Sequence, residues 1–119
     1  MKRDARLYLD DIVEAIQRIE EYSQHPDLDS FKKDRKSVDA IVRNFEIMGE
    51  AVNKIPSALR NRYPDIPWTE MLGMRNKLIH EYFGVDTEIL WKTIKENIPQ
   101  LHAQLRKILQ DMEQDSASK

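Results

Sequence analysis

The sequence contains no cysteine, only three glycines and five prolines among 119 residues, and a net charge of just −2. Without cysteine the chain forms neither disulfides nor thiolate metal sites, a composition that fits a reducing cytoplasm. The low glycine and proline contents favour helices over a turn-rich all-β fold. The basic surplus that is typical of nucleic-acid binders is also missing, so a nucleic-acid site has to be a local patch or be built by assembly.

Long apolar runs are absent too. No segment approaches the roughly 20 apolar residues of a membrane-spanning helix, and the charged residues from Lys2 to Asp4 come too early for the apolar part of a signal peptide. With 40% apolar and 34% charged residues, the composition is that of a globular protein. We therefore expect a cytoplasmic protein with one domain over residues 1–119, its core over about residues 5–112 and a polar tail over residues 114–119.

What the sequence does contain is apolar residues at three- and four-residue steps, the pattern of amphipathic helices. It predicts an all-α fold, an antiparallel bundle of four to five helices. The four main helices are expected over about residues 4–24, 30–55, 67–83 and 87–112. From Ser57 the pattern breaks up, and we expect a connector over residues 63–67, with room for one helical turn ahead of it.

Individual residues indicate where these helices begin and end. Asp29 or Ser30 is a suitable N-cap for the second helix, and Asp86 is one for the fourth. Gly84 is a C-terminal stop for the third helix, whereas Pro99 lies inside the fourth and should kink it.

Gly49 lies beside the apolar stripe of the second expected helix. Glycine at such a position costs a helix about 1 kcal/mol relative to alanine, so its presence needs a reason. Two interpretations remain open: a neighbouring helix comes close at this point, or the missing side chain leaves room for a ligand.

Arg75 is the unusual residue of the third expected helix. At 100° per residue, Arg75 and Tyr82 project from the middle of an apolar face that is formed by Trp68, Met71, Leu72, Leu78 and Ile79. Because burying an unpaired charge is heavily penalised, Arg75 must reach a carboxylate or lie at a seam that another molecule covers. An ordinary ion pair with Glu46 or Glu50 is one interpretation, and Tyr82 is then a core residue.

His80 lies on a second face of the same helix, offset from the first by roughly 100–140°. Thr69, Gly73 and Asn76 share this face, and their short side chains leave an open groove that leads to the imidazole. Taken alone, His80 is best interpreted as a helix cap or a surface residue.

Taken together, Arg75, His80 and Tyr82 have the spacing of an arginine, four residues, a histidine, one residue and a tyrosine. The long second helix adds a further block over residues 43–51, Arg-Asn-Phe-Glu-Ile-Met-Gly-Glu-Ala. With both, the chain resembles the HEPN superfamily, specifically the HepT-like toxins that are paired with a minimal nucleotidyltransferase antitoxin, MntA. The likeness covers most of the chain.

This resemblance implies a metal-independent endoribonuclease that acts on RNA, with Arg75 and His80 as catalytic residues, Asn76 in support, and neither a metal nor a cofactor. It also implies a symmetric homodimer, or a higher even oligomer, in which the motifs of two chains meet. In such pairs the antitoxin transfers AMP to the motif tyrosine, which in this sequence is Tyr82, and so silences the toxin.

The same residues suit metal-free RNA cleavage on chemical grounds. Histidine exchanges protons near neutral pH, because its unperturbed pKa is about 6.5, and the arginine fork can hold two phosphate oxygens. A single imidazole does not readily act as acid and base in one step, so we expect a two-fold related chain to supply a second His80. His25 and His102 lie on other expected segments and are weaker candidates.

Tyr82 lies about 200° around the helix from His80. Its phenol therefore reaches the catalytic groove only if the helix frays before Gly84 or if the second chain supplies it. An adenylyl group there would add bulk and negative charge, which would impede RNA entry and pair with Arg75.

Basic residues outnumber acidic ones around the motif, with Lys54, Arg60, Arg62, Arg75 and Lys77 against Asp65 and Glu70. This surplus favours RNA, although an ordinary solvated surface explains it as well. The lysine-rich run over residues 32–36 is expected to be an exposed helix start.

Two rival functions remain. In the first, the chain is a non-catalytic helical module whose Arg75, Asn76 and His80 recognise a nucleotide or a protein partner, which the acidic pI of about 5.9 favours. In the second, it is a structural oligomerisation bundle, which the polar residues in the apolar stripe disfavour.

Overall fold

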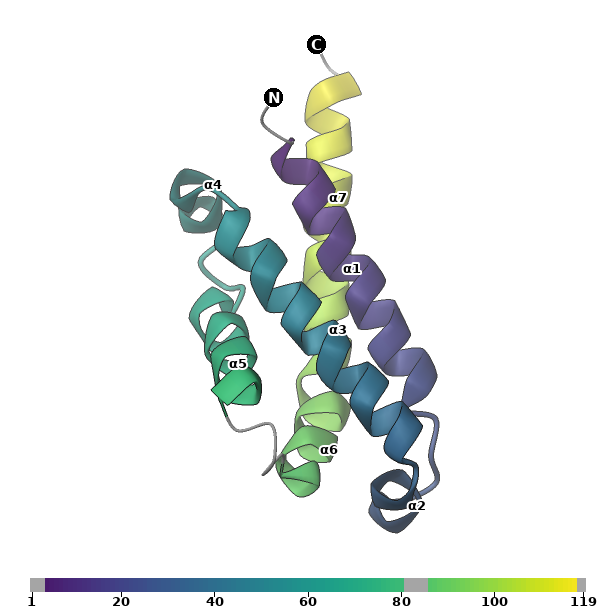
Figure 1. Ribbon diagram of the computed structural model, residues 1–119. Coiled ribbons are helices and arrows are strands. Elements are labelled where there is room, and N and C mark those ends of the chain that lie inside the picture. The colour runs from purple at the N-terminus through teal and green to yellow at the C-terminus, as the bar shows by residue number, and fades with distance from the viewer. Residues whose placement is uncertain (1–3, 81–85, 118–119) are drawn as a thin grey trace.

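The computed structural model describes residues 4–80 and 86–117, with the backbone alone for residues 78–80 and 115–117. The described residues are helical throughout, joined by short connections (Figure 1). The helices are α1 (Ala5–Tyr22), α2 (Leu28–Lys33), α3 (Arg35–Lys54), α4 (Ser57–Arg62), α5 (Trp68–His80), α6 (Thr87–Glu96) and α7 (Ile98–Ala117). The predicted all-α class is confirmed. No helix among the described residues has the length and apolarity needed to cross a membrane.

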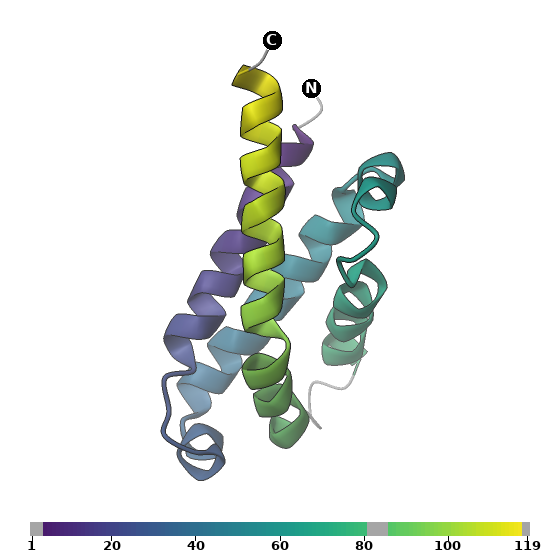
Figure 2. The same cartoon turned by 180° about the vertical axis from the view of Figure 1, so that it is seen from behind.

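The three long helices α1, α3 and α7 form the centre of the bundle. Figure 1 shows α1 and α3 side by side with α7 behind them. In Figure 2, which is seen from behind, α7 lies in front of both. Helix α5 lies against α3, on the side away from α1, and packs on little else (Figures 1 and 2). The helix that carries the candidate site therefore packs mainly on α3.

The core is built from the apolar stripes that the sequence pattern predicts. Helices α1 and α3 each bury one face, at positions three or four residues apart. The buried apolar side chains of these two helices are Leu9, Ile12, Val13, Ala15, Ile16, Ile19, Val38, Ile41, Val42, Phe45, Met48, Ala51 and Val52. At about 25 cal/mol per Å² of buried apolar surface, this contact is the main stabilising term of the bundle.

The second predicted helix is in fact two helices, and the predicted N-cap at Asp29 or Ser30 is wrong. Asp27 caps α2, with its side chain accepting from the Ser30 backbone N–H at 2.9 Å. Asp34 then caps α3, accepting from the backbone N–H of Ser37 at 3.2 Å. Each aspartate accepts a hydrogen bond from a backbone N–H that has no partner within its own helix. The two caps therefore start two separate helices, and the chain changes direction between α2 and α3.

The fourth predicted helix is likewise divided, at Asn97. Asp86 caps α6 as expected, accepting from the backbone N–H groups of Glu88 and Ile89 at 2.9 and 3.2 Å. Pro99 does not kink a continuous helix; it lies in the first turn of α7, where its missing N–H costs no hydrogen bond. The predicted end of the third helix at Phe83 and Gly84 lies outside the described residues.

A small polar and aromatic cluster closes the corner between α2 and α3. His25 Nε2–H donates to Asp34 Oδ2 at 3.0 Å, and its ring packs edge-on against Phe31 and Trp91. The Ser37 hydroxyl donates to the same carboxylate oxygen at 2.7 Å. The pKa of the Asp34 carboxyl is lowered from its ordinary 3.8. The largest cause is the hydrogen bond from the Ser37 hydroxyl, followed by those from His25 and from the Ser37 backbone N–H.

This pKa shift predicts an acid-labile corner. Because the pKa of Asp34 is lower in the folded chain than in the unfolded one, its contribution to stability is present above the unfolded pKa and is lost as pH falls through the folded pKa. The variant Asp34→Asn keeps an N-capping side chain without the charge. We expect it to lose less of its melting temperature than wild type between about pH 5 and about pH 2.5. Equal losses in calorimetry would contradict this assignment.

Candidate active site on helix α5

The start of α5 is fixed by Trp68. Its indole N–H lies between two backbone carbonyl oxygens, 3.1 Å from that of Arg60 and 3.0 Å from that of Tyr63. The ring itself is buried, at 8% exposed. A hydrogen bond of this kind contributes about 1 kcal/mol, and it joins α5 to the end of α4. The helix therefore has a fixed origin, and this determines where its later residues lie.

The two predicted faces of α5 are present as far as Asn76. Trp68 and Met71 are buried toward the core, whereas Thr69, Gly73 and Asn76 are exposed. Arg75 is half-buried on the inner face, as expected for a cation in an apolar stripe.

Arg75 lies directly over Gly49 of α3. A Cβ atom added at Gly49 would be 2.2 Å from Arg75 Cβ and 2.6 Å from its Cγ, far inside van der Waals contact. Of the two interpretations of Gly49, close approach of a neighbouring helix is therefore confirmed. The sequence showed an unusual glycine and an unusual arginine but not that they touch, because they are on different helices.

The polar end of Arg75 has few partners among the described residues. Nη1 donates to Asn76 Oδ1 at 3.0 Å, whereas the Nε–H is buried and has no hydrogen-bond partner there. The carboxylate pairing that the alternative interpretation needs is not found in this part of the chain. Glu46 instead lies 3.4 Å from Arg43, and Glu50 is exposed. A buried donor without an acceptor is costly, and within the described residues Arg60 Nε is in the same state.

His80 is the last residue of α5, and its side chain lies outside what the structure describes. Tyr82 lies outside the described residues altogether. The structure thus brings together Arg75, Asn76 and Gly49, and the meeting of Arg75 with His80 stays a prediction.

The two other histidines have structural roles. His25 belongs to the corner cluster between α2 and α3. His102 joins α7 to α1, with Nδ1 2.6 Å from Glu20 Oε1, and its Nε2 accepts from Arg106 Nε at 2.9 Å. Both rings are engaged on elements other than α5.

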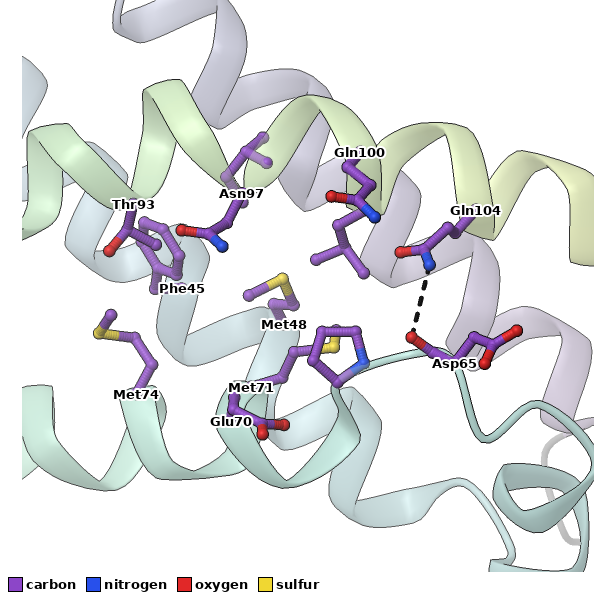
Figure 3. Close-up of a pocket in the computed structure, with 13 residues that line it drawn as sticks. Phe45, Met48, Asp65, Glu70, Met71, Met74, Thr93, Asn97, Gln100 and Gln104 are labelled. Atoms are coloured by element: carbon purple, nitrogen blue, oxygen red, sulfur yellow. Dashed lines mark hydrogen bonds between the residues drawn. The ribbon is translucent and has the colours of Figure 1, made fainter.

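A pocket on the inner side of α5 is separate from this arginine, which is not among its lining residues. It measures about 440 Å³ and lies between α5 and the α6–α7 junction, above Phe45 and Met48 of α3 (Figure 3). Met71 and Met74 line it on the α5 side, and side-chain amides line it on the other. Its described lining includes Asp65 and Glu70 but no lysine or arginine, a charge distribution that disfavours a phosphate group.

Within residues 4–80 and 86–117, no three histidine or carboxylate side chains lie close enough together to hold a metal ion.

Comparison with known proteins decides the family. Residues 12–108 match the family described as "Ribonuclease HepT-like". The chain belongs to the HepT-like ribonuclease family. This confirms the predicted resemblance and, at the level of the family, the predicted endoribonuclease.

Individual relatives of similar length agree. A protein of Thermococcus cleftensis named "Probable ribonuclease HepT" is 48% identical over 91% of this chain and 98% of its own. A Methanocaldococcus jannaschii protein named as an RNase is 42% identical over 94% of this chain and 93% of its own. One of Caldanaerobacter subterraneus, also named as an RNase, is 43% identical over 88% and 94%. No solved structure matches the chain.

Proposed function

We propose that this HepT-like protein is the toxin of a toxin–antitoxin pair and cleaves RNA without a metal, through Arg75 and His80. The observation that supports this most strongly is the Arg75 guanidinium, which lies half-buried at the α3–α5 contact with a buried Nε–H that lacks an acceptor among the described residues. A phosphate oxygen would satisfy that donor and bring the negative charge that the arginine lacks.

The chemistry assigns one role to each group. A His80 imidazole takes the proton of the ribose 2′-hydroxyl, and the 2′-oxygen attacks phosphorus. The bond from phosphorus to the 5′-oxygen then breaks, and a second, protonated imidazole gives that oxygen its proton. Arg75 stabilises the extra negative charge on the phosphate oxygens in the transition state. Asn76, which accepts from Arg75 Nη1, holds the guanidinium in place.

The need for two imidazoles makes the active site a shared one. Because the motif supplies one histidine per chain, a two-fold homodimer brings a second His80 to the same phosphate. The exposed outer face of α5, with Thr69, Gly73 and Asn76, leaves space for RNA to approach.

Regulation follows from Tyr82. A nucleotidyltransferase antitoxin of the MntA type would transfer AMP to its phenol: the phenolic oxygen bonds to the α-phosphorus of ATP, and pyrophosphate leaves. The added phosphate is an anion placed two residues from His80, where it would compete with RNA for Arg75.

Loss of either catalytic group should abolish cleavage. We expect Arg75→Ala and His80→Ala each to lower the RNA cleavage rate by about 10²-fold or more, with no effect of a chelator on wild type. The matched control is Lys107→Ala, which removes an exposed cation of α7 outside the basic residues around the motif and should change the rate by less than about fivefold. Cleavage is followed on labelled RNA. Tight RNA binding by wild type without cleavage would instead favour a binding module.

Subunit mixing tests whether the site is shared. Wild type is mixed with a ninefold excess of His80→Ala and allowed to exchange subunits. The activity per wild-type chain should then fall to about a tenth, because random pairing leaves few dimers with two histidines. An activity per wild-type chain that does not change on mixing would show that one chain suffices.

Modification is tested at Tyr82. The variant Tyr82→Phe lacks the acceptor oxygen, so a partner nucleotidyltransferase should transfer no labelled AMP to it and should leave its RNA cleavage unchanged. The control is Tyr63→Phe, which changes a half-buried tyrosine ahead of α5 and should be labelled like wild type. Undiminished labelling of Tyr82→Phe would place the acceptor elsewhere.

A further inference from the structure

We propose that Gly49 is a positioning residue for catalysis: the absence of a side chain at this position on α3 determines where the Arg75 guanidinium lies. This inference rests on the proposed role of Arg75 and extends it to a residue on another helix. Gly49 is buried, and the three heavy atoms nearest to an added Cβ there all belong to the Arg75 side chain.

A methyl group at position 49 would clash with the base of the Arg75 side chain. An added Cβ at Gly49 would meet Arg75 Cβ at 2.2 Å, Cγ at 2.6 Å and Cδ at 3.3 Å, whereas ordinary contact begins at 3.4 Å. The two closest atoms are the ones nearest the backbone, so moving the guanidinium end does not relieve the clash. The position of Cβ is set by the backbone and is the same in every rotamer, so relief requires α5 to shift relative to α3 by about 1 Å.

The shift would fall on the part of α5 that carries the active site. Trp68 holds the start of the helix through two hydrogen bonds, so the helix moves most readily beyond that anchor, at Arg75 and toward His80. A displacement of about 1 Å in a catalytic group can cost about 10²-fold in rate. Because Gly49 has no side chain, the stem of Arg75 can pack closely against α3, and this contact determines where the arginine lies.

The chain offers a matched control on α5 itself. Gly73 is exposed, two residues before Arg75, and an added Cβ there has no atom of the described residues within 4 Å. Both glycines are inside helices, so alanine adds the same helix propensity at each, about 1 kcal/mol. At position 49 the new methyl group would clash with Arg75, whereas at position 73 it has no atom of the described residues within 4 Å.

The test compares these variants in RNA cleavage and thermal melting. We expect Gly49→Ala to lower kcat/KM by about 10²-fold, whereas Asp39→Ala, on the exposed side of the same helix, should stay within about threefold of wild type. Gly73→Ala serves as the stability control and should melt at a higher temperature than wild type. Gly49→Ala with wild-type kcat/KM would overturn the proposal.

Chemical rescue then separates positioning from a general packing role. Arg75→Gly removes the side chain that opposes position 49, and added guanidinium ions at low concentration should restore part of its activity. The double variant Gly49→Ala/Arg75→Gly should be rescued to the same level, within about twofold, and should melt at or above the temperature of Arg75→Gly, because alanine adds helix propensity. Weaker rescue or lower stability of the double variant would overturn the proposal, because Gly49 would then matter without the arginine.

The activities of Arg75→Ala and Gly49→Ala together distinguish failure of the positioning role of Gly49 from failure of the proposed function. If Arg75→Ala retains full cleavage, the proposed role of Arg75 fails, whatever Gly49 does. If Arg75→Ala is inactive and Gly49→Ala is fully active, the role of Arg75 stands and the positioning role of Gly49 fails.

Discussion

The contact between α3 and α5 is the constraint on which the rest of the site depends. At this contact the Cβ, Cγ and Cδ atoms of Arg75 pack so closely against Gly49 that no larger residue fits at position 49. The contact buries the apolar stem while leaving the guanidinium at the edge, as arginine commonly does at such seams. Trp68 fixes where α5 begins, and the α1–α3 core fixes α3. The result is a permanent cation whose buried Nε–H has no hydrogen-bond partner among the residues that the structure describes.

This arrangement accounts for a ribonuclease whose chain has a net charge of −2. A protein that wraps RNA needs many cations, but a protein that holds one phosphate needs one cation whose position is fixed. The pocket between α5 and the α6–α7 junction is lined by Asp65 and Glu70 and is not suited to a phosphate, which agrees with a single phosphate site at Arg75. Specificity for a scissile phosphate then depends on geometry more than on total charge.

Much of the fold could be predicted because it follows from apolar periodicity, and the faces of α5 were predicted correctly through Asn76. The break at Asp34 was missed because a lysine-rich run with one aspartate looks like an exposed helix start, and the cap depends on its bonds with Ser37 and His25. The break at Asn97 was missed because the apolar stripe continues through it. The partner of Gly49 could not be predicted, since no periodicity within one helix shows which residue of another helix lies opposite.

The central claim is that the Arg75 Nε–H is held ready for a phosphate oxygen. Nuclear magnetic resonance of arginine side chains tests it directly, with the Arg75 Nε–H signal identified by its loss in Arg75→Lys. On addition of a short 2′-O-methyl RNA that cannot be cleaved, this signal should move downfield and exchange more slowly with water, and salt should weaken both effects. An Arg75 signal that stays unchanged when the protein is saturated with RNA would contradict the account.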